Sequence, residues 1–359
     1  MAKIKPINVK EAVKKCEALR RDTKVPVDIS LSDYFKDTQG ISMETVYSDL
    51  GINPTVDTIQ NIINMPDNSL RWLIPEIYRD AIRLGLRRAP IYPNLIAGEQ
   101  SVAQTSVKMP AINMSEAAPK KVGIGETIQT GSVSFDQKNV TIYKYGRGFK
   151  IPYEIVQYVP LNLVAIYLQD FGVKMGMGLD NMAITTLLNG DQPGGGDSIA
   201  TIGVATANDL VFRDLLKPWV RMGRLGKNAN QMIAGEDMAV EVLELLTNTR
   251  VVGTQRINVN VKSPLPQNAN VFVHGSVPAN TTIILDPSTA LIKLNAQPLL
   301  IESDRVVANQ TQEVYATFTT GFATIFRDSR IALNMALAFS GNGFPTWMNP
   351  VNQEQVSFE

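Results

Sequence analysis

The chain has 359 residues, of which 44% are hydrophobic and 19% are charged, enough for a substantial core in one or two domains. Lysine plus arginine and aspartate plus glutamate each total 34, and this balance argues against a dedicated nucleic-acid binder without excluding a local basic face. The single cysteine excludes internal disulfides and CxxC metal sites, and the sequence has neither a secretory signal core nor an apolar run of about 18 residues that could span a membrane.

The first 24 residues predict a short amphipathic helix. Val9, Val13 and Cys16 recur at helical spacing and are expected to face inward, with Cys16 as a buried structural thiol. The candidate residues for a basic face directed at a polyanion are Lys10, Lys14, Lys15, Arg20 and Arg21. Because charge runs are usually solvated helix faces, both a polyanion-binding face and an ordinary solvated face remain open.

Residues 28–64 predict an arm that lies on another part of the molecule. Short helical pieces alternate there with Asp, Ser, Asn, Gly and Pro, and this pattern indicates loose packing rather than an independent core. Residues 71–88 then return to helical spacing, and Pro90 and Pro93 end that helix.

Residues 101–151 predict a long two-stranded hairpin. Apolar and polar residues alternate with period two on both sides of a glycine-rich segment, Asn113 to Gly131, which contains Lys120 and Lys121. Since an isolated hairpin is only marginally stable in water, we expect this one to lie on a neighbour.

A helix from Pro160 to Asn189 is the strongest single prediction. Its length would be roughly 45 Å at about 1.5 Å per residue. Three internal glycines, Gly172, Gly176 and Gly178, each cost about 1 kcal/mol relative to alanine, so we expect either a closely packed backbone or a bend there. The apolar stripe consists of Leu161, Val164, Leu168, Phe171, Met175, Leu179 and Met182.

The remainder predicts mixed helix and sheet. Residues 190–300 alternate short strands with amphipathic helices, which is typical of a compact α+β or α/β unit. Residues 300–340 are strand-rich, and we expect a sheet formed by them, up to the alternating Ile331 to Leu337, to pack on the long helix.

Few residues in the chain suit catalysis or metal binding. His274 is the one histidine and has no nucleophile motif nearby, and Gly194 to Gly196 lack the lysine of a phosphate loop. Asp191 and Asp197 flank those glycines but make a poor calcium site without further oxygen ligands. We therefore expect no enzyme activity, no cofactor and no metal site, and an α/β enzyme is the weaker alternative.

The order of these elements resembles that of tailed-phage major capsid proteins of the Hong Kong phage type, a fold shared with encapsulins. Local patterns are also similar: Gly125-Glu126, the strand residues Phe135, Val140 and Ile142, then Glu154 to Val156 before the spine helix, and the helix ending from Asp180 to Gly190. Each pattern alone is weak, and their order carries the resemblance.

The resemblance implies an α+β capsid fold with six parts. These are an N-terminal arm (1–100), an extended hairpin loop (101–150), a peripheral segment with the spine helix (151–190), an axial domain (191–299), peripheral return strands (300–345) and a C-terminal tail (346–359). The inter-subunit contact candidates in the loop are Lys120, Lys121, Gly123, Gly125, Glu126 and Gly131, and the basic residues of the first helix would line the shell interior.

The resemblance also implies the function of a major capsid protein of a tailed double-stranded DNA bacteriophage. Copies of the chain would assemble in the host cytoplasm into the pentamers and hexamers of an icosahedral shell, the virion capsid. Further expected partners are scaffolding, portal and decoration proteins and the packaged DNA, bound without sequence preference, with no membrane partner. Because the sequence begins at Met1, we expect no cleaved fused scaffold. An encapsulin-type nanocompartment shell, loaded with protein cargo, is the alternative.

Overall fold

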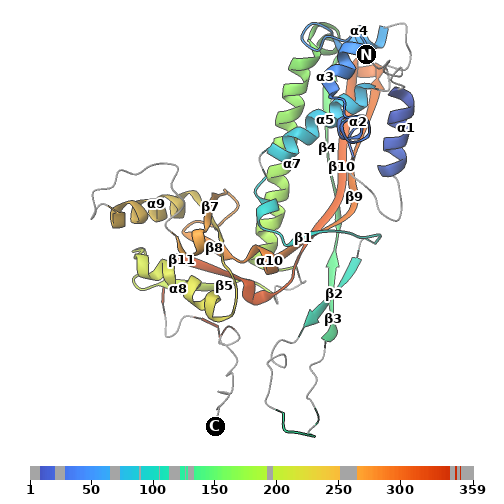
Figure 1. The fold of residues 1–359 in the computed structure, drawn as a ribbon. Coiled ribbons are helices and arrows are strands. Elements are labelled where there is room, and N and C mark those ends of the chain that lie inside the picture. The colour runs from blue at the N-terminus through green and yellow to red at the C-terminus, as the bar shows by residue number, and fades with distance from the viewer. Residues whose placement is uncertain are drawn as a thin grey trace.

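The computed structural model describes residues 9–20, 29–64, 73–88, 90–104, 106–112, 122–125, 127, 133–191, 197–250, 265–339, 344–345 and 348. Figure 1 shows a long helix with one sheet along it, a second unit with its own sheet at the end of that helix, and a hairpin that extends away from both.

The long helix α7 spans Leu161–Asn189 and confirms the strongest prediction. Pro160 precedes its first turn, and Gly190 follows its last residue with φ 77°, a conformation that glycine adopts without strain. Five residues of the predicted stripe are buried, and Phe171 and Met182 are partly buried. The helix therefore uses the predicted stripe to organise the core.

Helix α5 (Leu73–Arg88) crosses α7 so closely that two glycines meet the opposite backbone. A Cβ at Gly85 would lie 2.0 Å from the Gln169 carbonyl oxygen, and one at Gly172 would lie 2.1 Å from the Ile82 carbonyl oxygen. No side chain fits at either position. This confirms that the expected close backbone explains Gly172, whereas Gly178 has open space around it.

A four-stranded sheet packs on α7 in the strand order β1-β9-β10-β4. Its strands are β1 (Gly98–Ser101), β9 (Leu291–Val306), β10 (Thr311–Thr324) and β4 (Tyr143–Pro152). Ile151, Val314 and Leu168 belong to one buried cluster that joins the sheet to the helix, so the expected packing of this sheet on α7 is confirmed. The predicted division at residue 299/300 falls inside β9, because β9 pairs with β10 along most of its length.

A five-stranded sheet forms the second unit, in the order β5-β11-β8-β6-β7. Its strands are β5 (Ala200–Val204), β11 (Arg330–Ala338), β8 (Thr281–Leu285), β6 (Gln231–Ala234) and β7 (Asn270–Val273). The placement of Ile331 to Leu337 in the sheet along α7 is therefore wrong. Arg330 to Leu333 are buried without alternation, as in a strand covered on both faces, and β11 lies between β5 and β8.

The N-terminal helices share a core with α5. They are α1 (Val9–Arg20), α2 (Leu31–Gln39), α3 (Met43–Asp49) and α4 (Ile59–Asn64). Cys16 is buried in this cluster, and burial raises the pKa of its thiol to about 11, which fits the predicted structural role. Helices α6 (Tyr153–Tyr158) and α10 (Pro287–Ala290) are short, and no helix in the described ranges is long and apolar enough to cross a membrane.

We predict that Gly172→Ala lowers the free energy of unfolding of the unassembled subunit by about 2 kcal/mol or more, because its methyl group overlaps the Ile82 carbonyl oxygen. The matched control is Gly178→Ala in the same helix, which should raise stability by about 0.5–1 kcal/mol. Urea unfolding of both variants measures the difference, and equal effects would contradict the close crossing.

Candidate assembly surface

The projecting hairpin consists of β2 (Ser106–Ile112) and β3 (Val133–Thr141). The strands pair antiparallel from Ser106 opposite Thr141 to Ile112 opposite Val133. In Figure 1 the hairpin extends beyond the end of the four-stranded sheet, away from the N-terminal helices. At its root, Val140 and Ile142 pack with Leu294 and Ala323 of that sheet. The hairpin is thus anchored at one end and extended at the other.

Two of the six predicted contact residues, Gly123 and Gly125, lie in the described part of the segment between β2 and β3. Gly125 has φ 88°, in the region that favours glycine, and a Cβ there would meet open space. Gly123 also lies in the described part of the tip, next to the fully exposed Ile124. Lys120, Lys121, Glu126 and Gly131 lie outside the described residues, so the tip contacts stay a prediction.

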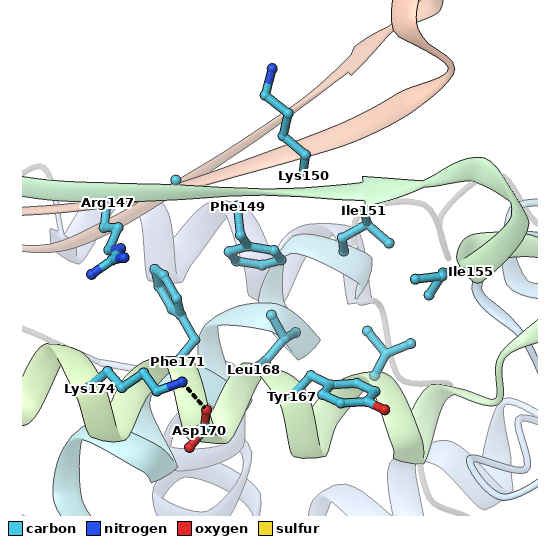
Figure 2. Close-up of a pocket in the computed structure, with 12 residues that line it drawn as sticks. Arg147, Phe149, Lys150, Ile151, Ile155, Tyr167, Leu168, Asp170, Phe171 and Lys174 are labelled. Carbon is cyan, nitrogen blue, oxygen red and sulfur yellow. Dashed lines mark ion pairs between the residues drawn. The ribbon is translucent and has the colours of Figure 1, made fainter.

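An apolar groove of about 470 Å³ runs between β4 and the N-terminal half of α7. Figure 2 shows Phe149 and Ile151 pointing from the strand toward the helix, where the rings of Phe149 and Phe171 lie 5.0 Å apart. Lys150 points to the opposite side of the strand and pairs with Glu313 at 2.8 Å, as the alternation of a strand requires. β4 is an edge strand of its sheet in the described structure, so the groove lies beside an open ladder.

Exposed apolar side chains continue from this groove over α6 and α7. Ile166 and Tyr167 are 52% and 65% exposed, and Leu163 and Tyr158 are exposed with them. Contiguous exposed apolar surface marks interaction sites. Sequence reasoning found the buried apolar stripe of α7 and missed these exposed apolar side chains. The available signal was that α7 is apolar on more than one side, unlike a surface helix of a monomer.

The predicted basic face of α1 is partly present. Lys10, Lys14 and Lys15 are exposed, and Lys15 forms an exposed ion pair with Glu11 at 3.0 Å. Arg20 is a correction: its guanidinium is buried and donates to both carboxylate oxygens of Glu76, each at 2.6 Å. It faces inward because it lies at helical spacing from Cys16 on the apolar side. Arg21 lies outside the described residues.

A second acidic group lies buried beside this ion pair. Both carboxylate oxygens of Asp80 are shielded from solvent. Burial, and then the negative charge of Glu76, raise the pKa of Asp80 to about 6, while Ser30, Ser32 and then the positive charge of Arg83 oppose the shift. The attachment of the N-terminal helices to α5 therefore includes a carboxyl group that titrates near neutral pH.

The polar residues considered for chemistry have structural partners. The Asp191 carboxylate accepts a hydrogen bond from the Thr324 amide at 2.7 Å, and the Asp197 carboxylate accepts one from the Thr324 hydroxyl at 2.6 Å. His274 Nδ1 accepts from the Ser276 amide at 3.1 Å. Within the described ranges, no three His, Cys, Asp or Glu residues lie together as a metal site would require. The two aspartates thus connect the segment between α7 and β5 to the end of β10, whereas the His274 contact is local.

Comparison with known proteins points to one class. The sequence pattern of the family described as "Phage capsid protein" matches residues 136–333. The fold is similar to the capsid of a native GTA particle at 12% identity, TM-score 0.52, covering 68% of this chain and 89% of that one. No curated protein matches the sequence.

Two further solved structures are similar at TM-score 0.50 and 11% identity. One is a virus-like particle from Pyrococcus furiosus, with 72% of this chain and 97% of that chain covered. The other is from Microbacterium phage Oxtober96, with 68% and 91% covered. At these identities the structural likeness shows the fold, and the family pattern carries the relationship.

We predict that the unassembled subunit loses stability as pH rises from about 4 to about 6. Asp80 binds its proton more tightly in the folded than in the unfolded chain, so unfolding releases a proton in this window and the free energy of unfolding falls, then levels off above it. Asp80→Asn should reduce this slope and raise stability at pH 7 by about 1–3 kcal/mol, while Asp180, whose pKa is also raised by burial, keeps its own share of the slope. The control is Asp37→Asn on the exposed side of α2. Urea unfolding across pH tests this, and an unchanged slope in Asp80→Asn would contradict it.

Proposed function

The chain belongs to the phage capsid protein family, whose pattern covers more than half of it, and from this premise we propose how the subunit works. It is a phage major capsid protein, a structural component of the virion. We propose that its copies form the pentamers and hexamers of an icosahedral shell that encloses double-stranded DNA. Its role would be structural rather than catalytic.

The observation that carries this proposal is the hairpin β2–β3. It is anchored to its own chain at the root by a small apolar cluster, and its strands otherwise pair with each other. A two-stranded ribbon in water is marginally stable, so a protein that extends one gains stability when a neighbour covers it. We propose that the hairpin of each copy lies on an adjacent copy in the shell. The exposed apolar side chains of α6 and α7 support the same conclusion, because contact with an adjacent copy would remove them from water.

We propose that the face of α1 formed by Lys10, Lys14 and Lys15 is directed at the packaged DNA. The three side chains are exposed on one helix, and contact with phosphates would release counterions without reading sequence. Scaffolding, portal and decoration proteins are further proposed partners, and assembly would occur in the host cytoplasm.

The first test removes the hairpin tip. Residues 113–132 are replaced by Asn-Gly, which joins Ile112 to Val133, the pair that ends the ladder. We expect soluble, folded subunits that form no closed shells, because the ribbon no longer reaches its neighbour. Electron microscopy and sedimentation of the variant and of the full chain measure this. Normal closed particles from the variant would refute the proposal that the hairpin lies on an adjacent copy in the shell. Wild-type particles that contain protein cargo instead of DNA would favour the encapsulin-type alternative.

The second test neutralises the basic face. Lys10, Lys14 and Lys15 are changed to Gln, and the control changes three exposed lysines elsewhere, Lys36, Lys144 and Lys174. If each lysine of α1 contacts one phosphate, the slope of log binding constant against log salt should become shallower by up to roughly three. Binding of a DNA duplex to unassembled subunits, titrated with salt, measures this slope. Equal slopes in the variant and the control would refute the DNA-facing role.

A further inference from the structure

Two helices cover the same face of the five-stranded sheet. They are α8 (Phe212–Arg224) and α9 (Glu236–Arg250), and Trp219 and Val242 from them belong to one buried cluster with Ile284 and Ile331 of the sheet. The opposite face, with Ile283, packs toward the end of α7. α8 contacts β11, and α9 contacts β6 and β8, so the helices lie toward opposite edges of the sheet. Figure 1 shows both on the side of this unit away from α7.

The two helices carry opposite charge. α8 has four basic residues and one acidic residue, and that acidic residue, Asp214, is buried and paired with Lys217 at 2.6 Å. α9 has four acidic residues and one basic residue at its last position. A chain with no net charge thus segregates positive and negative charge onto neighbouring helices of one unit.

Each helix also exposes apolar side chains within its charged face. On α8, Val220 is 70% exposed, and the exposed Arg213 and Arg224 lie at helical spacing from it. On α9, Val240 is 64% and Leu243 is 55% exposed. The exposed carboxylates around these two are Glu236, Glu241 and Glu244. Both faces therefore have an apolar centre with a charged surround, as the core and rim of a protein interface do.

We infer that the outer face of α8 in one copy packs against the outer face of α9 in the next copy of this chain. This inference rests on the proposed function, because it names the contact through which the subunits would form rings. Two different patches that complement one another make a head-to-tail contact, which closes into a ring when the rotation is right. α8 against α8, or α9 against α9, would place like charges together, so α8 must face α9. A two-fold pair could also place each α8 on the other copy's α9, and it is the ring of the proposed function that selects the head-to-tail contact.

A second copy fits these faces better than a nucleic acid does. A polyanion would be attracted to Arg213 and Arg224 but would leave Val220 uncovered and would be repelled by α9 on the same side of the sheet. A second copy presents Val240 to Val220 and carboxylates to the arginines in one contact. Each face supplies the charge that the other lacks.

Charge reversal tests the inference. The variants are Arg213→Glu with Arg224→Glu on α8, Glu241→Arg with Glu244→Arg on α9, and all four changes in one chain. We expect each double variant to form no closed shells. We expect the variant with all four substitutions to form them again, because the ion pairs between the helices are then restored with reversed sign. Electron microscopy and sedimentation velocity measure assembly, and circular dichroism with thermal unfolding of subunits shows that the fold is kept.

The outcomes separate this inference from the proposed function. Failure of the wild-type chain to form shells would refute the proposed function itself. If the wild-type chain forms shells and both double variants also form normal shells, the inference alone is overturned. The same holds if the variant with all four substitutions assembles no better than either double variant. Normal shells with DNA binding lost in the α8 variant would overturn it in favour of a nucleic-acid surface. The matched control exchanges an exposed opposite pair on α2, Lys36→Glu with Asp37→Lys, and should assemble normally.

Mixing the two reversed pairs gives a sharper result. At the substituted positions, one variant then carries acidic side chains on both helices and the other carries basic side chains on both, so unlike copies attract one another and join in alternation. Alternating members close rings of even number and exclude rings of odd number. We expect six-membered rings, sheets or tubes from the mixture, and no closed shell with five-fold vertices. Closed shells from the mixture would overturn the head-to-tail contact.

Discussion

The close approach of two helix backbones, at Gly85 of α5 and Gly172 of α7, is the constraint on which the arrangement depends. Each glycine costs about 1 kcal/mol in a helix interior, and both occur where a methyl group would overlap a carbonyl oxygen of the other helix. The contact fixes α5, which carries the N-terminal helices, against α7, which carries both sheets. The α5–α7 contact therefore joins the part of the chain before the hairpin to the part after it.

Buried polar contacts extend the same connection along α7. The Asp180 carboxylate, which is buried, accepts hydrogen bonds from the amides of Ile91 and Tyr92 at 2.8–3.1 Å and so holds the segment that leaves α5. At the end of the helix, buried Arg330 at the start of β11 donates to the Asp197 carbonyl. Such groups are costly to bury without partners, so each contact specifies where its segment must lie. The second unit is fixed to α7 itself by apolar contacts and by the hydrogen bond that the Ile199 amide donates to the Leu188 carbonyl at 2.9 Å.

The features predicted from sequence are those with a local signal. The periodicity of α7, its limits at Pro160 and Gly190, and the pairing of the hairpin strands each follow from residues near one another, and the structure has them. The predicted hairpin of 101–150 is too long, because residues 143–150 belong to β4 and pair with β10 in the four-stranded sheet. The partner of β11 depends on pairing with distant strands, which no local pattern contains. Arg20 was assigned to the surface by its charge, whereas Glu76, 56 residues away, allows it to be buried. The complementary charges of α8 and α9 became visible only when the structure placed the two helices on one face of the same sheet.

The root of the hairpin has a mechanical consequence. β3 continues into β4 with one residue, Ile142, between them, so the ribbon and the sheet are a single strand path held by one small apolar cluster. In the shell proposed above, a small rotation at Ile142 would turn β2 and β3 together, because they are joined to the sheet through this residue and its cluster. The hairpin would then reach neighbours at different tilts while the body of the subunit keeps one conformation.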